Sequence, residues 1–381
     1  MEMCRALDRR GTATTIATTD ADGVGRLDVP VGVPGLYEGV RTLFFRRLAS
    51  ESFKYSPDLA TWLAKNVRAF DVVHIHAVMS HACVAAARAC RASGVPFVLR
   101  TIGTLDDWSL GQKPLRKRVF MHMFGNQMLA DAETIHTTAP GEFQMLRRAF
   151  ELRHVALVPL GVDDMWLDAA QQPTAVPPYL LAMSRMHPVK GLDQLIPAFA
   201  RATEDPARAE WRLVIAGDGD PAYVQQLRAL ARTTAAASRI DFVGWAQGAL
   251  KADLLRRASA FVLPSFHENF GLAALEALAC GVPTIVGEGV QLASWIGEEH
   301  AGWITTPEVD TLARVLSDVF SDPVERGRRG LAGRRLASRM RWSVVADQLV
   351  DVYEQARVRA SESPSMMPPA QRAAARVGQG R

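Results

Sequence analysis

Short apolar segments alternate with amphipathic segments along most of the chain, and this alternation restricts the possible folds strongly. Buried strands are predicted at residues 71–78 (DVVHIHAV), 95–104 (VPFVLRTIGT) and 260–265 (AFVLPS), and a stretch with helical periodicity follows each of them. Strands that alternate with helices form parallel sheets whose two faces are covered by helices. The pattern therefore predicts an α/β protein.

Two domains are expected, because the chain has 381 residues and a domain commonly holds about 100–200. Residues 169–178 (AAQQPTAVPP) have the composition of a linker. A doubly wound domain opens with a strand, whereas this chain opens with a helical segment, so we expect the first strand and its loop to be missing. We expect doubly wound domains over 1–165 and 166–341, a helix over 342–360 and a disordered tail over 361–381.

Composition excludes several classes of protein. The net charge of +4 is too small to indicate nucleic-acid binding. There is no run of about 18 apolar residues, as a membrane span needs, and the first residues do not resemble a signal peptide. The four cysteines have no metal-ligand spacing, so they are expected to be buried in a reducing compartment. We therefore expect a cytoplasmic protein without a metal site.

Two glutamates flank the start of a predicted helix in residues 265–287 (SFHENFGLAALEALACGVPTIVG). Glu268 lies in the loop after a strand, where ligands of open α/β sheets bind. Glu276 lies further along the helix, and its side chain leans back toward the helix start. Carboxylates accept hydrogen bonds from hydroxyl groups, so a ligand with hydroxyls on either side of a phosphate, a nucleotide sugar, would suit both. Donors for the phosphate would be the backbone amides of Asn269, Phe270, Gly271 and Leu272.

Alternatives to this interpretation remain open at the level of single motifs. Glu268 could instead help to cap the helix, and Glu276 could be an exposed surface charge. Arg185 and Lys190 (SRMHPVKG) follow another predicted strand and suit a diphosphate, but they could equally be solvated loop cations.

Glycines follow a third strand of the second half. Gly217 and Gly219 (AGDGD) permit a close approach of the backbone, and residues 239–245 (RIDFVGW) end in an aromatic side chain suited to a nucleobase. The dinucleotide fingerprint is incomplete, because its third glycine is absent. An NAD-dependent enzyme is therefore not favoured.

Together these motifs resemble those of the GT-B glycosyltransferases of family 4. The donor-binding domain of that family is similar to residues 179–287, through SRMHPVKG, GDGD and the spacing of the two glutamates, and VPLGVD is similar to its crossover segment. The N-terminal half resembles the family more loosely, through VVHIHAV and TIGTLDDWSL. The resemblance covers about residues 1–358. It implies two Rossmann-like domains that face a cleft, the N-terminal one incomplete, with the last helix crossing back to the N-terminal domain.

The resemblance also implies an activity. Family members transfer a sugar, with retention and without a metal, from a nucleoside diphosphate sugar, here expected to be a UDP-sugar. The acceptor would be a glycan or a lipid-linked molecule in polysaccharide biosynthesis. By match, Arg185 and Lys190 would hold the diphosphate, and the amides of residues 270–272 would meet its phosphates. Glu268 would contact the sugar hydroxyls, and Glu276 the ribose.

The N-terminal half departs from the family pattern at one functional position. Where many members carry a histidine in a Pro-His-Gly stretch, this chain has Ile102. Asp106 and Asp107 follow a few residues later and could contact the acceptor, although loop or capping residues have the same appearance. His76 ends its predicted strand and could line the cleft, or it could be an ordinary core histidine.

The run KPLRKR (113–118) starts a predicted helix and could contact anionic membrane headgroups, in which case the protein would be peripheral to the membrane. A solvated helix face is the alternative. Two other functions stay open: a catalytically impaired protein that binds a nucleotide sugar, and a GT-B-fold nucleotide-sugar epimerase, which would need no acceptor.

Overall fold

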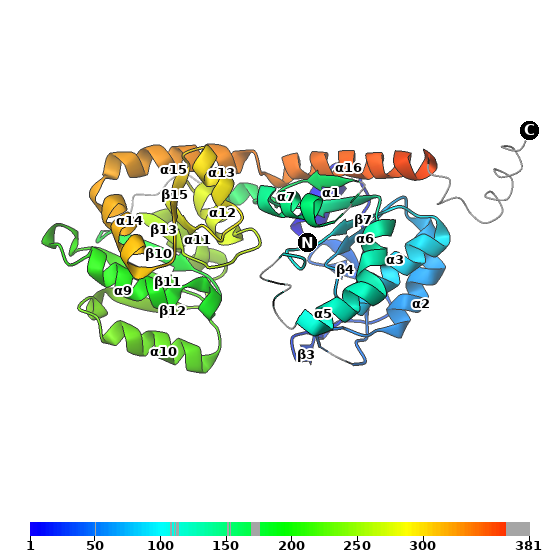
Figure 1. The fold of residues 1–381 in the computed structure, drawn as a ribbon, viewed down its shortest axis with the longest axis horizontal. Helices are drawn as coiled ribbons and strands as arrows, with labels where there is room; N and C mark the ends of the chain where they lie inside the picture. Colours follow the sequence, from blue (N-terminus) through cyan, green and yellow to red (C-terminus); the bar gives the residue numbers. More distant parts are fainter. Residues whose placement is uncertain are drawn as a thin grey trace, which may run out of the picture. The chain divides into compact units, whose positions relative to one another are not determined.

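The computed structural model describes residues 1–49, 51–106, 109, 111, 114–150, 152, 154–168 and 176–362. Residues 363–381 of the predicted tail, residues 169–175 of the predicted linker, Asp107 and Lys113 lie outside the described residues. The chain divides into two compact units, which are Met1–Pro159 with Ser343–Arg381 (unit 1) and Leu160–Trp342 (unit 2) (Figure 1). Both contain a parallel sheet, which confirms the predicted α/β fold. Among the described helices, none is long and apolar enough to cross a membrane.

Unit 1 holds a parallel four-stranded sheet and a smaller three-stranded sheet. Its helices are α1 (Glu2–Arg9), α2 (Pro57–Asn66), α3 (His81–Ser93), α5 (Pro114–Phe120), α6 (Asn126–Asp131), α7 (Pro140–Ala149) and α16 (Trp342–Glu362), whose first residue belongs to unit 2. Its strands are β1 (Ile16–Thr19), β2 (Ala21–Asp22), β3 (Gly25–Arg26), β4 (Pro34–Tyr37), β5 (Val40–Phe45), β6 (Val73–His76), β7 (Phe97–Arg100), β8 (Thr134–Thr137) and β9 (Val155–Leu157).

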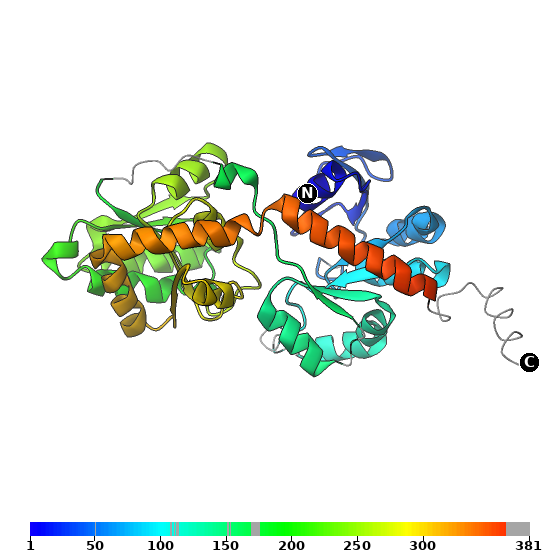
Figure 2. The ribbon, with the colours of Figure 1, turned by 90° about the horizontal axis from the view of Figure 1, so that it is seen from above.

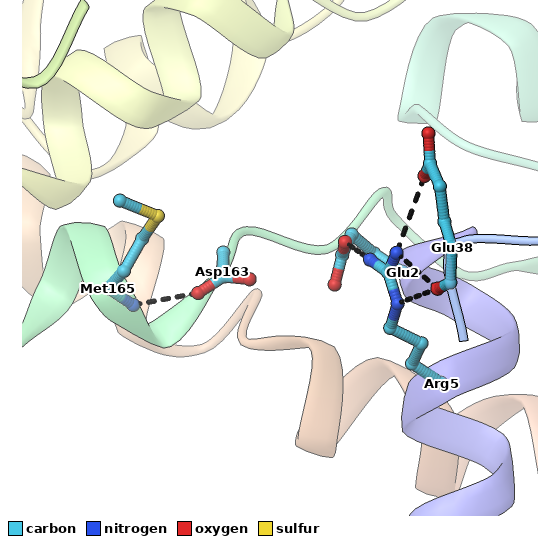
Figure 3. A network of polar contacts seen from close by, with 5 residues as sticks. All are labelled: Glu2, Arg5, Glu38, Asp163 and Met165. Atoms are coloured by element: carbon cyan, nitrogen blue, oxygen red, sulfur yellow. Dashed lines mark hydrogen bonds and ion pairs between the residues drawn. The ribbon is translucent and has the colours of Figure 1, made fainter. Parts of the chain in front are cut away.

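The strands of unit 1 fall into the orders β1-β5-β4 and β6-β7-β8-β9. β1 pairs in parallel with β5, whereas β4 and β5 form an antiparallel hairpin. Glu38 and Gly39 turn this hairpin with φ values of 48° and 78°, which is the left-handed region that a tight hairpin turn requires. Arg5 on α1 donates to the Glu38 carbonyl oxygen at 3.0 and 2.6 Å, and it pairs with Glu2 (Figure 3). These bonds fix α1 against the hairpin.

The two faces of the four-stranded sheet differ in polarity. One face carries Ile75, Phe97, Leu99 and Ile135, which are buried in a core shared with α2, α3 and β5. Because side chains alternate along a strand, the other face carries the intervening residues, which are mostly polar. α16 lies along unit 1 in Figure 2, and its Arg359 donates to Thr134 Oγ1 on this polar face at 2.6 Å.

Unit 2 holds a six-stranded sheet in which all strands are parallel. Its strands are β10 (Tyr179–Met183), β11 (Arg212–Ala216), β12 (Ile240–Gly244), β13 (Ala260–Leu263), β14 (Thr284–Gly287) and β15 (Gly302–Thr305). Its helices are α8 (Asp164–Leu167), α9 (Leu192–Ala202), α10 (Pro221–Arg232), α11 (Gly248–Arg257), α12 (Leu272–Ala279), α13 (Ala293–Glu298), α14 (Val309–Ser321) and α15 (Pro323–Ser338).

The sheet order of unit 2 is β12-β11-β10-β13-β14-β15, which is the order of a doubly wound dinucleotide-binding domain. The strands are buried apolar runs, as expected for strands covered on both faces. α9 and α14 pack with the sheet in one core that includes Leu180, Phe199 and Leu316. At the start of the unit, Asp163 caps α8 by accepting a hydrogen bond from the Met165 amide at 2.8 Å (Figure 3).

Candidate functional site

The candidate site lies where the strand order of unit 2 reverses. From β10 the chain proceeds to β11 on one side, and the later strand β13 pairs on the other side of β10. The loops after these two strands therefore diverge and leave a crevice outside the carboxyl ends of the strands. The loop after β10 carries Arg185 and Lys190, and the loop after β13 carries Glu268. The fold thus places predicted residues from two distant segments at one edge of the sheet.

Glycines allow these loops to pack directly on one another. A Cβ atom on Gly217 would lie 1.9 Å from the Ser184 carbonyl oxygen, and one on Gly219 would lie 2.0 Å from the Met186 carbonyl oxygen. In return, the Met186 amide donates to the Asp218 carbonyl oxygen at 2.8 Å. We predicted a close backbone approach at both glycines. In the structure the neighbour that approaches them is the loop after β10.

Lys190 and Glu268 form an ion pair between the two loops. Their side chains are only 12 and 24 % exposed. The loops are joined beside the pair, because the Phe266 amide donates to the Val189 carbonyl oxygen at 2.9 Å. Gly191 follows with a φ of 66° and turns the chain into α9. Lys190 and Glu268 are therefore held by backbone contacts as well as by their charges.

The amino terminus of α12 lies at the same edge. Gly271 precedes the helix with a φ of 100°, a conformation that favours glycine, and its Cβ position would lie 2.8 Å from Val290 Cγ1. Phe270 is buried, whereas Leu272 is 48 % exposed. Asn269 is partly buried. The first amides of a helix have no acceptor within the helix, so this end of α12 suits an anion.

Glu276 on α12 is paired with Lys251 on α11 through a contact of 2.6 Å between Nζ and Oε1. Burial raises the pKa of the Glu276 carboxyl, and the lysine opposes that rise. The Lys251 ammonium also lies 5.3 Å from the centroid of the Trp166 ring. Lys251 is a residue of the candidate site that sequence reasoning missed; its position on the helix after the strand end near residue 245 is the signal that could have found it.

The charges of this group favour an anion. Lys190 and Lys251 each face one glutamate, and Arg185 makes no side-chain hydrogen bond or ion pair with the residues that the structure describes. Each lysine thus balances one glutamate, and Arg185 adds a third cation on the loop that carries Lys190. The pairing also removes the difficulty of two bare carboxylates beside a phosphate, because each carboxylate has its own cation.

Comparisons with known proteins give the family of the chain. A model described as "Glycosyl transferases group 1" matches residues 167–336, and one described as "Glycosyl transferase 4-like domain" matches residues 1–161. A glycogen synthase of Mycobacterium tuberculosis is 30 % identical over 292 residues, which is 74 % of this chain and 68 % of that protein. The chain is a glycosyltransferase of the group 1, GT4-like family.

Further comparisons give one more sequence relative of this glycosyltransferase and two solved structures with a similar fold. A D-inositol 3-phosphate glycosyltransferase of Jonesia denitrificans is 31 % identical over 239 residues, and the match spans 61 % of this chain but 54 % of that protein. The sucrose-phosphate synthase of Thermosynechococcus elongatus has a similar structure, with a TM-score of 0.73, 20 % identity and coverage of 93 and 91 % of the two chains. HepE of Anabaena, in complex with UDP and glucose, gives a TM-score of 0.66 at 17 % identity, with coverage of 89 and 99 %. These structures show that the fold is that of GT-B proteins.

Two predicted residues of the glycosyltransferase lie in unit 1. Asp106 accepts a hydrogen bond from the Ser109 amide at 2.5 Å, as a capping residue does. His76 ends β6, and its ring lies 4.3 Å from the ring of His74. Removal from water, together with a smaller effect of the nearby Arg100, lowers the pKa of His76 to about 3, so this imidazole is neutral. The four cysteines are buried and free, in agreement with the sequence analysis.

Proposed function

We propose that this glycosyltransferase moves a sugar, with retention, from a nucleoside diphosphate sugar to a glycan or lipid-linked acceptor in cytoplasmic polysaccharide biosynthesis. The observation that carries the proposal is the group formed by the two Lys–Glu pairs and the start of α12. A UDP-sugar is the donor we propose, since HepE, a neighbour of the same fold, was obtained with UDP.

Each residue of the group then has a role. Arg185, Lys190 and the amides before α12 bind the diphosphate and stabilise the negative charge that grows as it leaves, so we propose that no metal is required. Glu268 accepts hydrogen bonds from the donor sugar, and Glu276 accepts them from the ribose. Trp245, which is 64 % exposed after β12, offers an aromatic face to the base.

Bond changes in the proposed reaction balance without a protein nucleophile. The bond between the anomeric carbon and the phosphate oxygen breaks, and its electron pair stays on the diphosphate. The acceptor hydroxyl oxygen bonds to the anomeric carbon on the same side, and its proton passes to the departing phosphate oxygen. The cations around the diphosphate lower the energy of this charge separation.

Measurements of UDP affinity and of UDP release from a UDP-sugar distinguish the roles proposed for Lys190, Glu276 and Glu268. Lys190→Ala should weaken UDP binding about 10- to 100-fold, because a charge-assisted hydrogen bond contributes about 1.5–3 kcal/mol, and Glu276→Gln should weaken it as well. Glu268→Gln should reduce release of UDP from UDP-sugar more than it reduces UDP affinity. Arg314→Ala on the exposed face of α14 is the matched control. Small and equal effects of the three site variants in calorimetry would count against the assignment.

The same measurements distinguish the alternatives. A catalytically impaired binding protein would bind UDP and release none from any UDP-sugar. An epimerase would convert the sugar without an acceptor. Product analysis by mass spectrometry and NMR after incubation with UDP-sugars and acceptor extracts tells these outcomes apart.

We also propose that α5 contacts an anionic membrane. Leu115, Val119 and Met123 are 75, 50 and 59 % exposed and recur every four residues, so they project from one side of the helical segment. Arg116 and Arg118 are exposed beside them. An apolar stripe flanked by arginines suits the headgroup region of a membrane.

Vesicle sedimentation tests this contact. The protein should sediment with phosphatidylglycerol vesicles and not with phosphatidylcholine vesicles, and the double change Leu115→Ser, Val119→Ser should abolish sedimentation. Val324→Ser is the control, because Val324 is 81 % exposed in unit 2. Unchanged sedimentation of the double variant would refute the proposal.

Finally, we propose that, within the residues that the structure describes, the parallel sheet of unit 1 lacks one strand, together with the glycine-rich loop that follows that strand in the family. The strands of a doubly wound sheet lie in the spatial order 3-2-1-4-5-6, numbered along the chain. In this scheme β1 corresponds to strand 2, β5 to strand 3, and β6 to β9 to strand 4 and those after it. The unfilled place lies between β1 and β6. The amides of alternate residues of β6 face β7, and those of His74 and His76 face the unfilled place. Without a strand there to accept their hydrogen bonds, these two amides should exchange far faster than the amide of Ile75. Equal protection by hydrogen exchange would contradict this.

A further inference from the structure

A polar cluster lies at the carboxyl edge of the sheet in unit 1. The strand register places His76 beside Arg100, and Arg100 beside His136. Residues in register on neighbouring parallel strands project from the same face, so the three side chains share the polar face of the sheet. Arg100 is the charged member of this row, since burial and Arg100 lower the pKa of His136 to about 4.

Arg100 forms no ion pair with any residue that the structure describes. Its Nε atom is buried without a hydrogen-bond partner, and no side-chain hydrogen bond or ion pair joins its guanidinium to the described residues. Glu142 is the carboxylate that acts on it electrostatically. The oxygens of Glu142 already accept from Thr101 Oγ1 at 2.6 Å, the Gly103 amide at 2.9 Å and the Thr138 amide at 3.0 Å. A half-buried cation left unpaired is costly, and an incoming anion would remove that cost.

The histidines leave one further group available. His136 and His74 form a chain, in which His136 Nε2 contacts the Val158 carbonyl oxygen at 2.8 Å and His74 Nδ1 contacts the Tyr353 hydroxyl at 2.8 Å. His136 Nδ1 and His74 Nε2 close the chain at 3.2 Å. The ring of His76 makes no hydrogen bond to the described residues. Arg100 and His76 therefore retain hydrogen-bonding capacity at the same edge.

The backbone at this edge is held in an uncommon conformation. Ala77 and Ile102, the residues that follow β6 and lie just past β7, have φ values of 79° and 52°. A positive φ is a real outlier for a β-branched residue, and such outliers concentrate at functional sites. The Ala77 amide donates to the Arg100 carbonyl oxygen at 2.9 Å, and Glu142 holds the segment around Ile102 through Thr101 and Gly103. Hydrogen bonds therefore hold the backbone on both sides of Arg100 in place.

We infer that Arg100 and His76 form an oxyanion site, and that this site binds a phosphate or carboxylate of the acceptor. The planar guanidinium presents paired donors that match either group, and His76 adds a neutral donor. The role of the anion as part of the acceptor rests on the proposed transferase function. The anion site itself does not.

Thermal unfolding of the full chain tests the inference. Saturating UDP is present throughout, so that the candidate site of unit 2 is occupied. Inorganic phosphate, glucose 6-phosphate, glucuronate and neutral glucose are compared at constant ionic strength. At ten times its Kd, an anion that binds the site should raise Tm by roughly 3 °C. Arg100→Gln should abolish the shift and Arg100→Lys should reduce it, whereas Arg91→Gln, on the exposed face of α3, should preserve it.

The outcomes separate the two levels of the inference. Shifts with glucose 6-phosphate or glucuronate that exceed the shift with phosphate, and that Arg100→Gln removes, support an anionic acceptor. Equal shifts with phosphate and the sugar acids overturn the acceptor role and leave a simple anion site. Absence of any shift, or an equal shift in Arg100→Gln, overturns the site. The UDP shift measured alone tests the proposed function independently.

Discussion

The buried histidines of unit 1 should make this unit sensitive to mild acid. The fold keeps the imidazoles of His76 and His136 neutral, because removal from water lowers their pKa values to about 3 and about 4. In the unfolded chain each would titrate near its ordinary value of 6.5. Between these values the unfolded state binds more protons than the folded state. The histidines therefore stabilise the fold fully above about pH 6.5, and that contribution is lost as the pH falls toward the folded-state values.

The magnitude follows from the width of this window. For each pH unit below 6.5, each histidine lowers the free energy of unfolding by about 1.4 kcal/mol, so a fall to about pH 5 lowers it by about 2 kcal/mol per histidine. The pair then accounts for about 4 kcal/mol, a large part of the 5–15 kcal/mol that typically separates a folded domain from its unfolded state. Hydrogen exchange of peptides from β6 to β8, corrected for the intrinsic effect of pH, measures unit 1 separately from unit 2.

A variant isolates the histidine contribution from that of titrating carboxylates. His136→Gln should lower the free energy of unfolding at every pH, since it disrupts the contacts with His74 and Val158. As the pH falls from about 7.5 to about 5, however, the free energy of unfolding of the variant should decrease by about 2 kcal/mol less than that of the wild type. His122→Gln, at an exposed position of unit 1, should follow the wild type. Parallel pH profiles for the wild type and His136→Gln would refute the reasoning.

Two further predictions concern unit 2. Lys251→Ala leaves Glu276 half-buried without its cation, so we expect a loss of about 1–3 kcal/mol in urea unfolding and UDP binding at least about tenfold weaker. Unchanged UDP affinity would remove Lys251 from the site. Gly219→Ala places a Cβ atom 2.0 Å from the Met186 carbonyl oxygen, so it should destabilise unit 2 by more than about 2 kcal/mol. Gly327→Ala, with open space around its Cβ position on α15, should instead stabilise by about 0.5–1 kcal/mol, and equal effects would show that the loop contact is unimportant.

Local patterns were enough to predict much of the fold. Apolar runs bounded by glycine and proline predicted the strands near residues 73–76, 97–100 and 260–263, and helical periodicity predicted the last helix. The hairpin of β4 and β5 was not predicted, because β4 is short and its residues are mostly exposed. The sequence analysis also assigned no element to β15, whose exposed and half-buried positions weaken the apolar signal.

The residues of the candidate site could be proposed from the sequence, but their pairing could not. Residue type and position relative to a strand end were the basis for proposing Lys190, Glu268 and Glu276, because the carboxyl ends of parallel strands share an edge. Strand order cannot be read from a single sequence, and it is the position of β13 beside β10 that allows the ion pair of Lys190 with Glu268, 78 residues apart.

The sequence by itself therefore determined the α/β class and the kinds of side chain at the strand ends, since both depend on periodicity and composition within a few residues. Only the tertiary structure decided which charges are paired. Lys251 meets Glu276, whereas Arg100 forms no ion pair with a carboxylate of the described part of the chain, because pairing depends on how helices and loops from distant segments pack at one sheet edge.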